Sequence, residues 1–317
     1  MATTRGGLNI EPEIVCEGLG FPEGPVALRD GSVLLVEIAE GLLVRISAKG
    51  EKSVVASLGG GPNGAAIGPD GAVYVCNNGG LAFHREPGVT RVIGTPADYS
   101  GGRIERVDLA TGRFERLYDA CDGVPLNGPN DLVFDRHGGF YFTDHGKVRE
   151  TSIDRGRIYY AMADGSMIRR VIFPIFMPNG IALSPDEDTL YVAETETARL
   201  WSFRILSPGE VDLLPFPSPN GGRIVYGAGG FQRFDSMKVE AGGRVCVATL
   251  QIGGITTISP ADGFAEHTPM PDRNTTNLCF GGPDLRTVYV TLSHSGRLAR
   301  ARWPRAGHPL NFVDRAG

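Results

Sequence analysis

The sequence predicts an all-β fold, a six-bladed β-propeller with a metal site at one mouth of its central channel. The 317 residues include 45 glycines and 22 prolines. Few stretches without them carry apolar residues at helical spacing, which favours short strands joined by turns. One phrase also recurs along the chain, as FPEGPVALRDGSVLLVE, GPNGAAIGPDGAVYVCN, GPNDLVFDRHGGFYFTD, MPNGIALSPDEDTLYVAE, RFDSMKVEAGGRVCVAT and TTNLCFGGPDLRTVYVTL.

Each copy reads as a β-hairpin, because a short apolar strand, a turn and a second strand follow one polar residue. Most copies precede a further strand-like segment, such as ARLWSFRIL. A hairpin plus one or two strands, repeated about every fifty residues, is typical of propeller blades. A solenoid of stacked β-units is the alternative, but the variable strand lengths and insertions disfavour it.

We expect residues 14–317 to form one propeller domain and residues 1–13 to form an N-terminal extension. A strand around Ile14 to Glu17 should close the last blade beside GRLARARW. An open ring would leave strand edges unpaired, which favours this closure.

Composition excludes several partners. The chain has 31 basic and 36 acidic residues, a formal charge of −5 and no basic run that could follow a phosphate backbone, so we expect no nucleic-acid partner.

The chain has no apolar run of secretory or membrane-spanning length, and we expect a cytoplasmic protein without a membrane partner. We also expect a monomer or a weak homo-oligomer, and the five cysteines, which lack metal-type spacing, read as reduced thiols.

A polar residue stands just before the first strand of every copy. The six residues are Glu23, Asn63, Asn130, Asn179, Asp235 and Asn277. If the first strands are innermost, all six face one mouth of the channel. Such residues also suit turns, although a glutamate does not. Carboxylate and amide oxygens without His or Cys suit a hard cation, so we expect one divalent ion, Ca²⁺ first, with Zn²⁺, Mn²⁺, Mg²⁺ and Fe²⁺ as alternatives.

A second set of residues ends the returning strands at the same mouth. They are Glu37, Asn77, Asp144, Glu194, Thr249 and Leu292. We expect them to form an outer polar shell that orients the metal ligands. His145, beside Asp144, is either a surface residue or a group that reaches the cavity.

Three long connections should also emerge at this mouth, at residues 79–103, 146–157 and 207–234. Long loops on a rigid scaffold commonly recognise substrates. They contain residues that either bind a hydroxylated or anionic compound or are simply solvated: His84, Arg85, Tyr99, Arg149 and Arg155. The expected substrate-binding residues are Asn63, Asp144, His145 and Arg149.

No nucleophile elbow, zinc-protease helix, phosphate-binding loop or helix-loop-helix calcium loop is present in the sequence. Nucleophilic catalysis by Ser or Cys therefore has no local support. Hydrolysis centred on a metal ion is the reaction class that the pattern favours.

Four segments, FPEGP, LNGPNDLVFD, MPNGIALSPDEDTLYV and TTNLCFGGPDLRTVYVTL, resemble the senescence marker protein and gluconolactonase family. The resemblance extends from about Phe21 to Trp303. It implies a six-bladed propeller lactonase with one catalytic divalent ion. It also implies that Glu23, Asn179 and Asp235 hold the metal, that Asp235 is the general base, and that Asn130 contacts the substrate or completes the coordination.

The expected function is therefore a metal-dependent hydrolase that opens a small-molecule sugar lactone, of gluconolactone or pentonolactone type, with Asp235 and Asn130 as catalytic residues. The same site could instead hydrolyse phosphoesters or phosphofluoridates. A metal-free condensing relative of strictosidine synthase is disfavoured by the two carboxylates. A non-enzymatic binding propeller, in which metal only staples the channel, is the remaining alternative.

Overall fold

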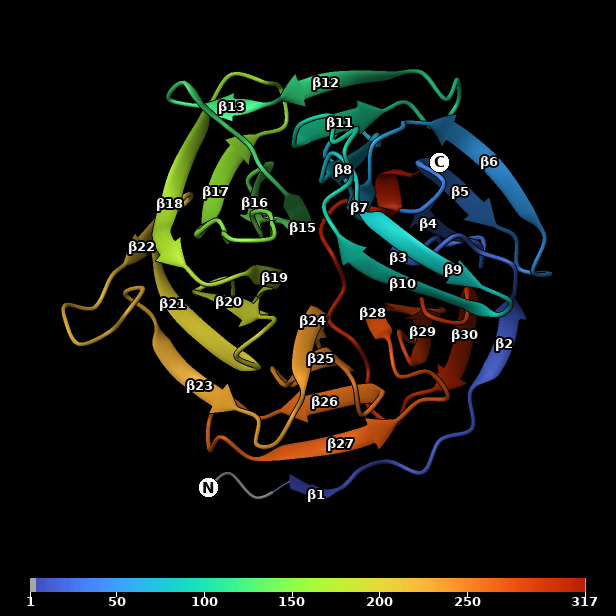
Figure 1. Cartoon of the computed structure of the whole chain (residues 1–317). Coiled ribbons are helices and arrows are strands. Elements are labelled where there is room, and N and C mark those ends of the chain that lie inside the picture. Colours follow the sequence, from blue (N-terminus) through green and yellow to red (C-terminus); the bar gives the residue numbers. More distant parts are fainter. Residues whose placement is uncertain (1–3, 317) are drawn as a thin grey trace.

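The computed structural model describes residues 4–316 and consists of β-sheets arranged around one central axis (Figure 1). Six sheets form six blades, and each contains at least four strands. The predicted all-β, six-bladed propeller is confirmed. Within residues 4–316, no helix is long and apolar enough to cross a membrane.

The strands of each blade follow one another outward from the axis. The inner strands are β3 (Pro22–Ala27), β7 (Pro62–Ile67), β15 (Pro129–Phe134), β19 (Pro178–Leu183), β24 (Arg233–Val239) and β28 (Thr275–Gly281). The second strands are β4 (Val33–Glu37), β8 (Val73–Asn77), β16 (Gly139–Asp144), β20 (Thr189–Glu194), β25 (Val245–Leu250) and β29 (Thr287–Leu292). The two halves of each repeated phrase therefore form the two strands nearest the channel.

The outer half of each blade is more variable. The third strands are β5 (Leu42–Ile46), β11 (Arg103–Val107), β17 (Gly156–Met162), β21 (Arg199–Ser207), β26 (Gly254–Ile258) and β30 (Arg297–Arg302). The outermost strands are β6 (Lys52–Ser57), β12 (Phe114–Tyr118), β18 (Ile168–Ile175), β22 (Glu210–Asp212) with β23 (Arg223–Gly227), β27 (Ala265–Pro269) and β2 (Glu13–Cys16). Two further ribbons, β9 (Ala82–Glu86) with β10 (Val89–Gly94) and β13 (Ala120–Cys121) with β14 (Val124–Pro125), lie outside the blades.

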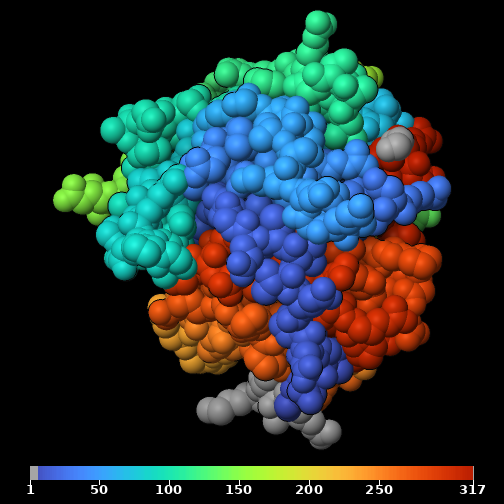
Figure 2. Space-filling model, turned by 90° about the vertical axis from the view of Figure 1, so that its right-hand side faces the viewer, coloured from blue at the N-terminus to red at the C-terminus, as the bar shows by residue number. Residues whose placement is uncertain are grey.

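The N-terminal part of the chain closes the ring. Strand β2 pairs antiparallel with β30, with Ile14 opposite Ala299, so the predicted closure of the last blade is confirmed. Strand β1 (Thr4–Gly6), which the sequence did not predict, pairs in parallel with β27 of blade five. Figure 2 shows this N-terminal segment in blue along the outer side of the molecule. The domain boundary at residue 14 stays a prediction.

Each inner strand is irregular where it enters the channel. In β3 the pairing register shifts between Glu23 and Val26, and in β19 it shifts between Pro178 and Ile181. Bulges of this kind redirect side chains. A Cβ atom on Gly180 would lie 2.6 Å from the carbonyl oxygen of Asp235, so glycine lets two inner strands approach closely.

The hydrophobic core lies between neighbouring blades. Between blades two and three, for example, the rings of Tyr74 and Phe134 pack edge to face with centroids 5.0 Å apart. The thiols of Cys76, Cys246 and Cys279 are buried and unoxidised in such clusters, as expected. Packing of this kind leaves the channel axis as the place where polar side chains can gather.

The C-terminal segment covers the end of the channel opposite the predicted metal mouth (Figure 1). It contains one short 3-10 helix, η1 (Val313–Arg315). The backbone N–H of His308 donates to the carbonyl of Val239 at 2.8 Å, and the Asn311 amide donates to that of Phe134 at 3.0 Å. These contacts join blades five and three, and nothing in the sequence pattern predicted them.

Candidate metal centre and active site

Six polar side chains enter the channel from equivalent positions on the inner strands. They are Glu23, Asn63, Asn130, Asn179, Asp235 and Asn277. We call them the ring residues. Asp235 is partly exposed, and the other five are buried. Since each inner strand packs beside the next around the axis, their common position places them at one level of the channel.

Glu23 is fixed by two hydrogen bonds to one of its oxygens. Its Oε2 accepts from the backbone N–H of Gly24 at 2.7 Å and from the side-chain amide of Asn277 at 2.7 Å. The Asn277 Oδ1 in turn accepts from the backbone N–H of Leu278 at 2.8 Å. Asn277 therefore orients Glu23, a role that its sequence position alone did not reveal.

Asn179 is oriented in a similar way. Its Nδ2 donates to Oγ1 of Thr195 at 3.1 Å. Its Oδ1 lies 3.5 Å from the hydroxyl of Ser236, which directly follows Asp235 in β24. The amide oxygen of Asn179 thus lies on the side of Asp235, and the two groups can act on one ligand.

The ring carboxylates lie in an environment that disfavours their negative charges. Burial raises the pKa of Glu23 to about 7. Burial, followed by the nearby charge of Glu23, raises the pKa of Asp235 well above its ordinary value. Two acids of this kind, held close together, favour the uptake of a cation or of protons.

Asn130 supplies an oxygen with no protein partner. Its Oδ1 is buried and accepts no hydrogen bond from residues 4–316. Leaving a buried acceptor unsatisfied costs about 1–3 kcal/mol, so such an atom needs a ligand. No group of three or more His, Cys, Asp or Glu side chains gathers as a metal site in the described chain. Two carboxylates with amide oxygens nevertheless fit a hard divalent cation.

Another carboxylate, which is buried, lies next to the ring. Asp131 follows Asn130, and its Oδ2 lies 4.0 Å from Nζ of Lys238 without a hydrogen-bond partner among residues 4–316. The charge of Asp131 contributes to the raised pKa values of both Glu23 and Asp235. Sequence analysis missed this residue, although the third phrase reads PND where the second and fourth read PNG.

No hydrogen bond joins the residues that end the second strands to the ring residues within residues 4–316, contrary to the expectation of an outer shell that orients the ligands. Four of the six instead bind the backbone that leads into the inner strands, whereas the Thr249 hydroxyl bonds the Val247 carbonyl and Thr256, and Leu292 has no polar side chain. Glu37 Oε1 accepts from Gly20 N–H at 2.7 Å, and Glu194 Oε1 accepts from Phe176 N–H at 3.1 Å. Each second strand ends beside the start of its own inner strand, and the N–H groups of the loop there are removed from water and need acceptors.

Asp144 shows the same arrangement in blade three. Its carboxylate accepts from the backbone N–H groups of Asn127, Gly128 and Gly146 at 2.7–3.0 Å. These bonds shape the loop that positions Asn130. A contact between Asp144 and the substrate stays a prediction.

The other expected substrate-binding residues lie at the same mouth but in different surroundings. Burial lowers the pKa of His145 to about 4, so its imidazole is neutral near pH 7. Arg149 is exposed and forms an ion pair with Asp154, with N–O distances of 2.6 and 3.1 Å. Asn63 is a buried ring residue. Their substrate contacts also stay predictions.

The blade-two insertion, residues 79–103, covers part of the mouth. Its hairpin, β9 and β10, lies over blades one and six (Figure 1). Arg85 donates to Glu40 Oε1 of blade one at 2.7 Å, and Thr90 N–H donates to the carbonyl of His294 in blade six at 2.8 Å. Arg85 is therefore used to hold the insertion in place.

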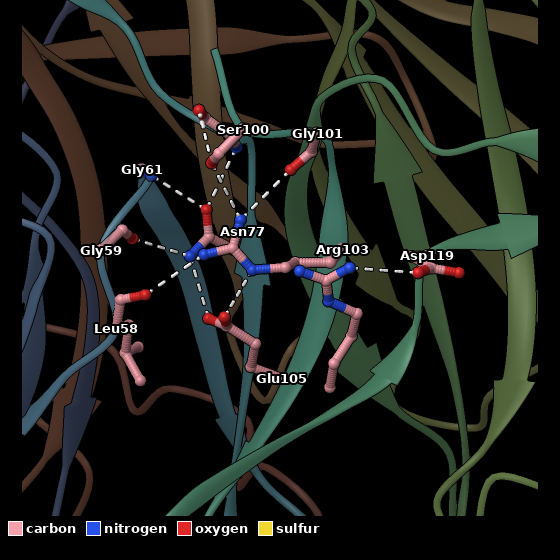
Figure 3. A network of polar contacts seen from close by, with 11 residues as sticks. Leu58, Gly59, Gly61, Asn77, Ser100, Gly101, Arg103, Glu105 and Asp119 are labelled. Atoms are coloured by element: carbon pink, nitrogen blue, oxygen red, sulfur yellow. Dashed lines mark hydrogen bonds and ion pairs between the residues drawn. The ribbon is translucent and has the colours of Figure 1, made fainter. Parts of the chain in front are cut away.

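A buried polar network fixes the root of this insertion (Figure 3). Arg103 Nε donates to Glu105 Oε1 at 2.5 Å, and both side chains are buried. The Asn77 amide donates to Glu105 Oε2 at 2.9 Å, while its Oδ1 accepts from Gly61 and Gly79 N–H groups at 2.9 and 3.1 Å. One network therefore positions both the insertion and the loop that precedes Asn63.

Lys147 connects the insertion to blade three. Its buried Nζ donates to the carbonyl of Gly80 at 2.8 Å and to Oδ1 of Asn78 at 3.4 Å, and it lies 4.9 Å from the ring centre of Tyr99. Burial lowers the pKa of Lys147 to about 8. Sequence analysis missed this residue because it has no distinguishing motif.

The fold and the ring define a class of protein: six-bladed propellers that gather carboxylate and amide oxygens at one mouth of the channel. Residues 21–294 match the family model described as SMP-30/Gluconolactonase/LRE-like region. The chain belongs to this family, and the resemblance expected from the sequence is confirmed.

Curated relatives of the chain carry lactonase names. It is 31% identical over 268 residues to lactonase drp35 of Staphylococcus saprophyticus, covering 83% of this chain and 73% of the relative. It is 25% identical over 311 residues to a gluconolactonase of Zymomonas mobilis, covering 89% and 79%. These names support the expectation of a lactone-hydrolysing enzyme.

Solved structures agree on the fold. A gluconolactonase of Xanthomonas campestris superposes with a TM-score of 0.71 at 20% identity, covering 96% of this chain and 99% of the other. Regucalcin of Agrobacterium tumefaciens, described as a calcium-binding protein, superposes with a TM-score of 0.69 at 19% identity, covering 98% and 100%.

Proposed function

We propose that this protein is a metal-dependent lactonase that opens a sugar lactone, of gluconolactone or pentonolactone type, to its hydroxy acid. Glu23, Asn179, Asp235 and Asn130 hold one divalent cation. The observation that carries the proposal is the buried, unpaired Oδ1 of Asn130 in the same ring of positions as two carboxylates with raised pKa values. The lactonase names of the curated relatives supply the reaction class.

The donor set favours Ca²⁺ among divalent cations. All four groups offer oxygen, which hard cations prefer, and His or Cys ligands are not among them. The structural likeness to a protein described as calcium-binding supports the same choice. The alternatives Zn²⁺, Mn²⁺, Mg²⁺ and Fe²⁺ can be compared with Ca²⁺ in the lactone assay described below.

When bound by these residues, a divalent cation would supply positive charge near the lactone carbonyl that water attacks. Asp235 accepts a proton from the attacking water, which requires its ionised form, and returns that proton to the lactone ring oxygen as the bond between this oxygen and the carbonyl carbon breaks. Asn130 orients that water or a substrate hydroxyl through its amide. Asn277 holds Glu23 by its 2.7 Å hydrogen bond, which favours one orientation of this carboxylate.

Turnover of a lactone panel tests the function. Acid release from glucono- and xylonolactone, corrected for spontaneous opening, should appear with divalent cation and disappear with EDTA. A phosphotriester and a phosphofluoridate are assayed in parallel. Hydrolysis of these compounds without lactone turnover would replace the proposal, and unchanged lactone turnover in EDTA would remove the metal from it.

Calorimetric titration tests the cation ligands separately from activity. Glu23→Gln and Asn179→Ala should both weaken divalent-cation binding, because each removes a charge or an oxygen ligand. His137→Ala is the control, since this exposed side chain lies in the blade-three turn between β15 and β16. Ligand variants that bind cations as tightly as the wild type would contradict the ring assignment.

A further inference from the structure

A cleft of about 330 Å³ lies between blades three and four, and none of the ring residues lines it. Blade three supplies Arg155 and the segment 174–176, and blade four supplies residues from β20, β21 and the loop between β22 and β23. We call it the blade three–four cleft. Its volume lies at the lower end of small-molecule sites, which fits a ligand of modest size.

Most of the cleft wall is apolar. Pro174 and Phe176 form one side, and Trp201 and Pro219 form the other. Phe176 is 40% exposed, whereas Trp201 is 5% exposed. A flat or narrow apolar body would fill the space between these rings and release water from them.

Two arginines give the cleft a positive charge. Arg155 and Arg199 are exposed, and neither guanidinium has a hydrogen bond or ion pair with another residue between 4 and 316. The opposing charge comes from Glu194, whose oxygens already accept from Phe176 N–H at 3.1 Å and from the Thr197 hydroxyl at 2.6 Å. Two unpaired guanidinium groups beside an engaged carboxylate favour an anionic ligand.

Two polar groups in the wall also lack partners. The indole Nε1–H of Trp201 and the amide Nδ2 of Asn220 are buried without hydrogen-bond partners in the described chain. Asn220 is 7% exposed, and its Oδ1 already accepts from Gly222 N–H at 2.9 Å. Both unsatisfied groups are donors, so a ligand oxygen that reached either one would relieve its cost.

We propose that the blade three–four cleft binds a small monocarboxylate with an apolar ring, with the carboxylate between Arg155 and Arg199 and the ring against Trp201 and Phe176. The arginines favour a ligand with a negative charge, and the apolar wall favours a ligand with an apolar ring. The cleft shares no residue with the ring residues of the channel, so this inference is independent of the proposed function.

Calorimetric titration with phenylacetate tests the inference. EDTA is present so that the ring residues of the channel contribute no metal-dependent binding. Phenylacetamide, which has the same ring without the charge, should bind at least about tenfold more weakly, and so should gluconate, which has the charge without the ring. Phenylacetate should also change the fluorescence of Trp201. Trp303, the other tryptophan, is fully buried and should be unaffected.

The double variant Arg155→Gln, Arg199→Gln should weaken phenylacetate binding by about tenfold or more. Arg113→Gln is the matched control, because this exposed arginine lies in the turn between β11 and β12. Equal affinity for phenylacetate and phenylacetamide, or no heat with phenylacetate at millimolar concentration, overturns the inference without reliance on any variant. Unchanged affinity in a folded double variant overturns the assignment of the arginines.

Discussion

Asp131 occupies a position where the other inner strands have uncharged residues. The equivalent residues are Gly24, Gly64, Gly180, Ser236 and Leu278. A carboxylate here increases the negative potential at the ring, and Lys238 at 4.0 Å offsets part of it. If the ring binds a cation as proposed, we therefore expect its affinity to depend on side chains next to the ligands as well as on the ligands.

Asp131→Asn and Lys238→Met should change cation affinity in opposite directions. Loss of the carboxylate should weaken divalent-cation binding by on the order of tenfold, and loss of the ammonium should strengthen it. Calorimetric titration at one ionic strength measures both. A shift in the same direction for the two variants would mean that packing, rather than charge, causes the change.

Asp235 and Asn130 have separable roles in the proposed mechanism. Asp235→Asn should lose on the order of 10² or more in turnover even at saturating cation, because an amide cannot accept the proton. Asn130→Ala should still bind the cation but lose turnover or substrate affinity. Acid release at several cation concentrations distinguishes the two. Near wild-type turnover by cation-loaded Asp235→Asn would remove the assignment of the base.

At the scale of elements, the blade-two insertion is held at both of its ends, and it also contacts blades one, three and six. The Arg103–Glu105 pair anchors its root, and Lys147 attaches it to blade three. Figure 2 shows that this part of the chain, in teal, projects from one side of the molecule. Its position over the mouth makes it an element that can select substrates by size.

Lys147→Met should loosen the insertion without unfolding the propeller, because it removes two hydrogen bonds and the contact with Tyr99. We expect a raised KM with a smaller change in kcat, and faster hydrogen exchange in residues 79–103. Lys49→Met, at an exposed position in blade one, is the control. Unaltered exchange in the insertion would show that Lys147 does not hold it.

At the scale of the whole molecule, the ring of blades is closed by the N-terminal segment. Deletion of residues 1–17 removes both β1 and β2, whereas deletion of residues 1–11 removes only β1. The longer deletion should lower the melting temperature much more, because it exposes the edge of β30. Differential scanning calorimetry of both forms measures this. Equal melting temperatures would contradict closure through β2.

The buried carboxylates make the stability of the metal-free protein depend on pH. The pKa of Glu23 rises from 4.5 to about 7 on folding, so between these values the folded state binds more protons than the unfolded state. Stability should therefore fall as pH rises through this window. In EDTA the melting temperature should be lower at pH 8 than at pH 5.5, and divalent cation should restore it at pH 8. Glu23→Gln should reduce the dependence, and an unchanged slope would exclude Glu23 as its source.

The sequence alone determined the six blades and the ring, because one local pattern, repeated with the same spacing, places the same position of each inner strand at the channel. The sequence also predicted that the strand around Ile14 completes the last blade, since an open ring would leave unfavourable unpaired strand edges. The sequence also placed Asn277 in the ring but not its bond to Glu23, which joins the two ends of the chain.

Only the tertiary structure decided which groups meet across blades. The Asp131–Lys238 pair, the anchoring of the insertion by Lys147, the C-terminal cover of the channel and the blade three–four cleft each join segments far apart in the sequence. Strand periodicity and turn residues report local backbone preferences. The distance between side chains on different blades depends instead on how the sheets pack around the axis, so no local pattern encodes it.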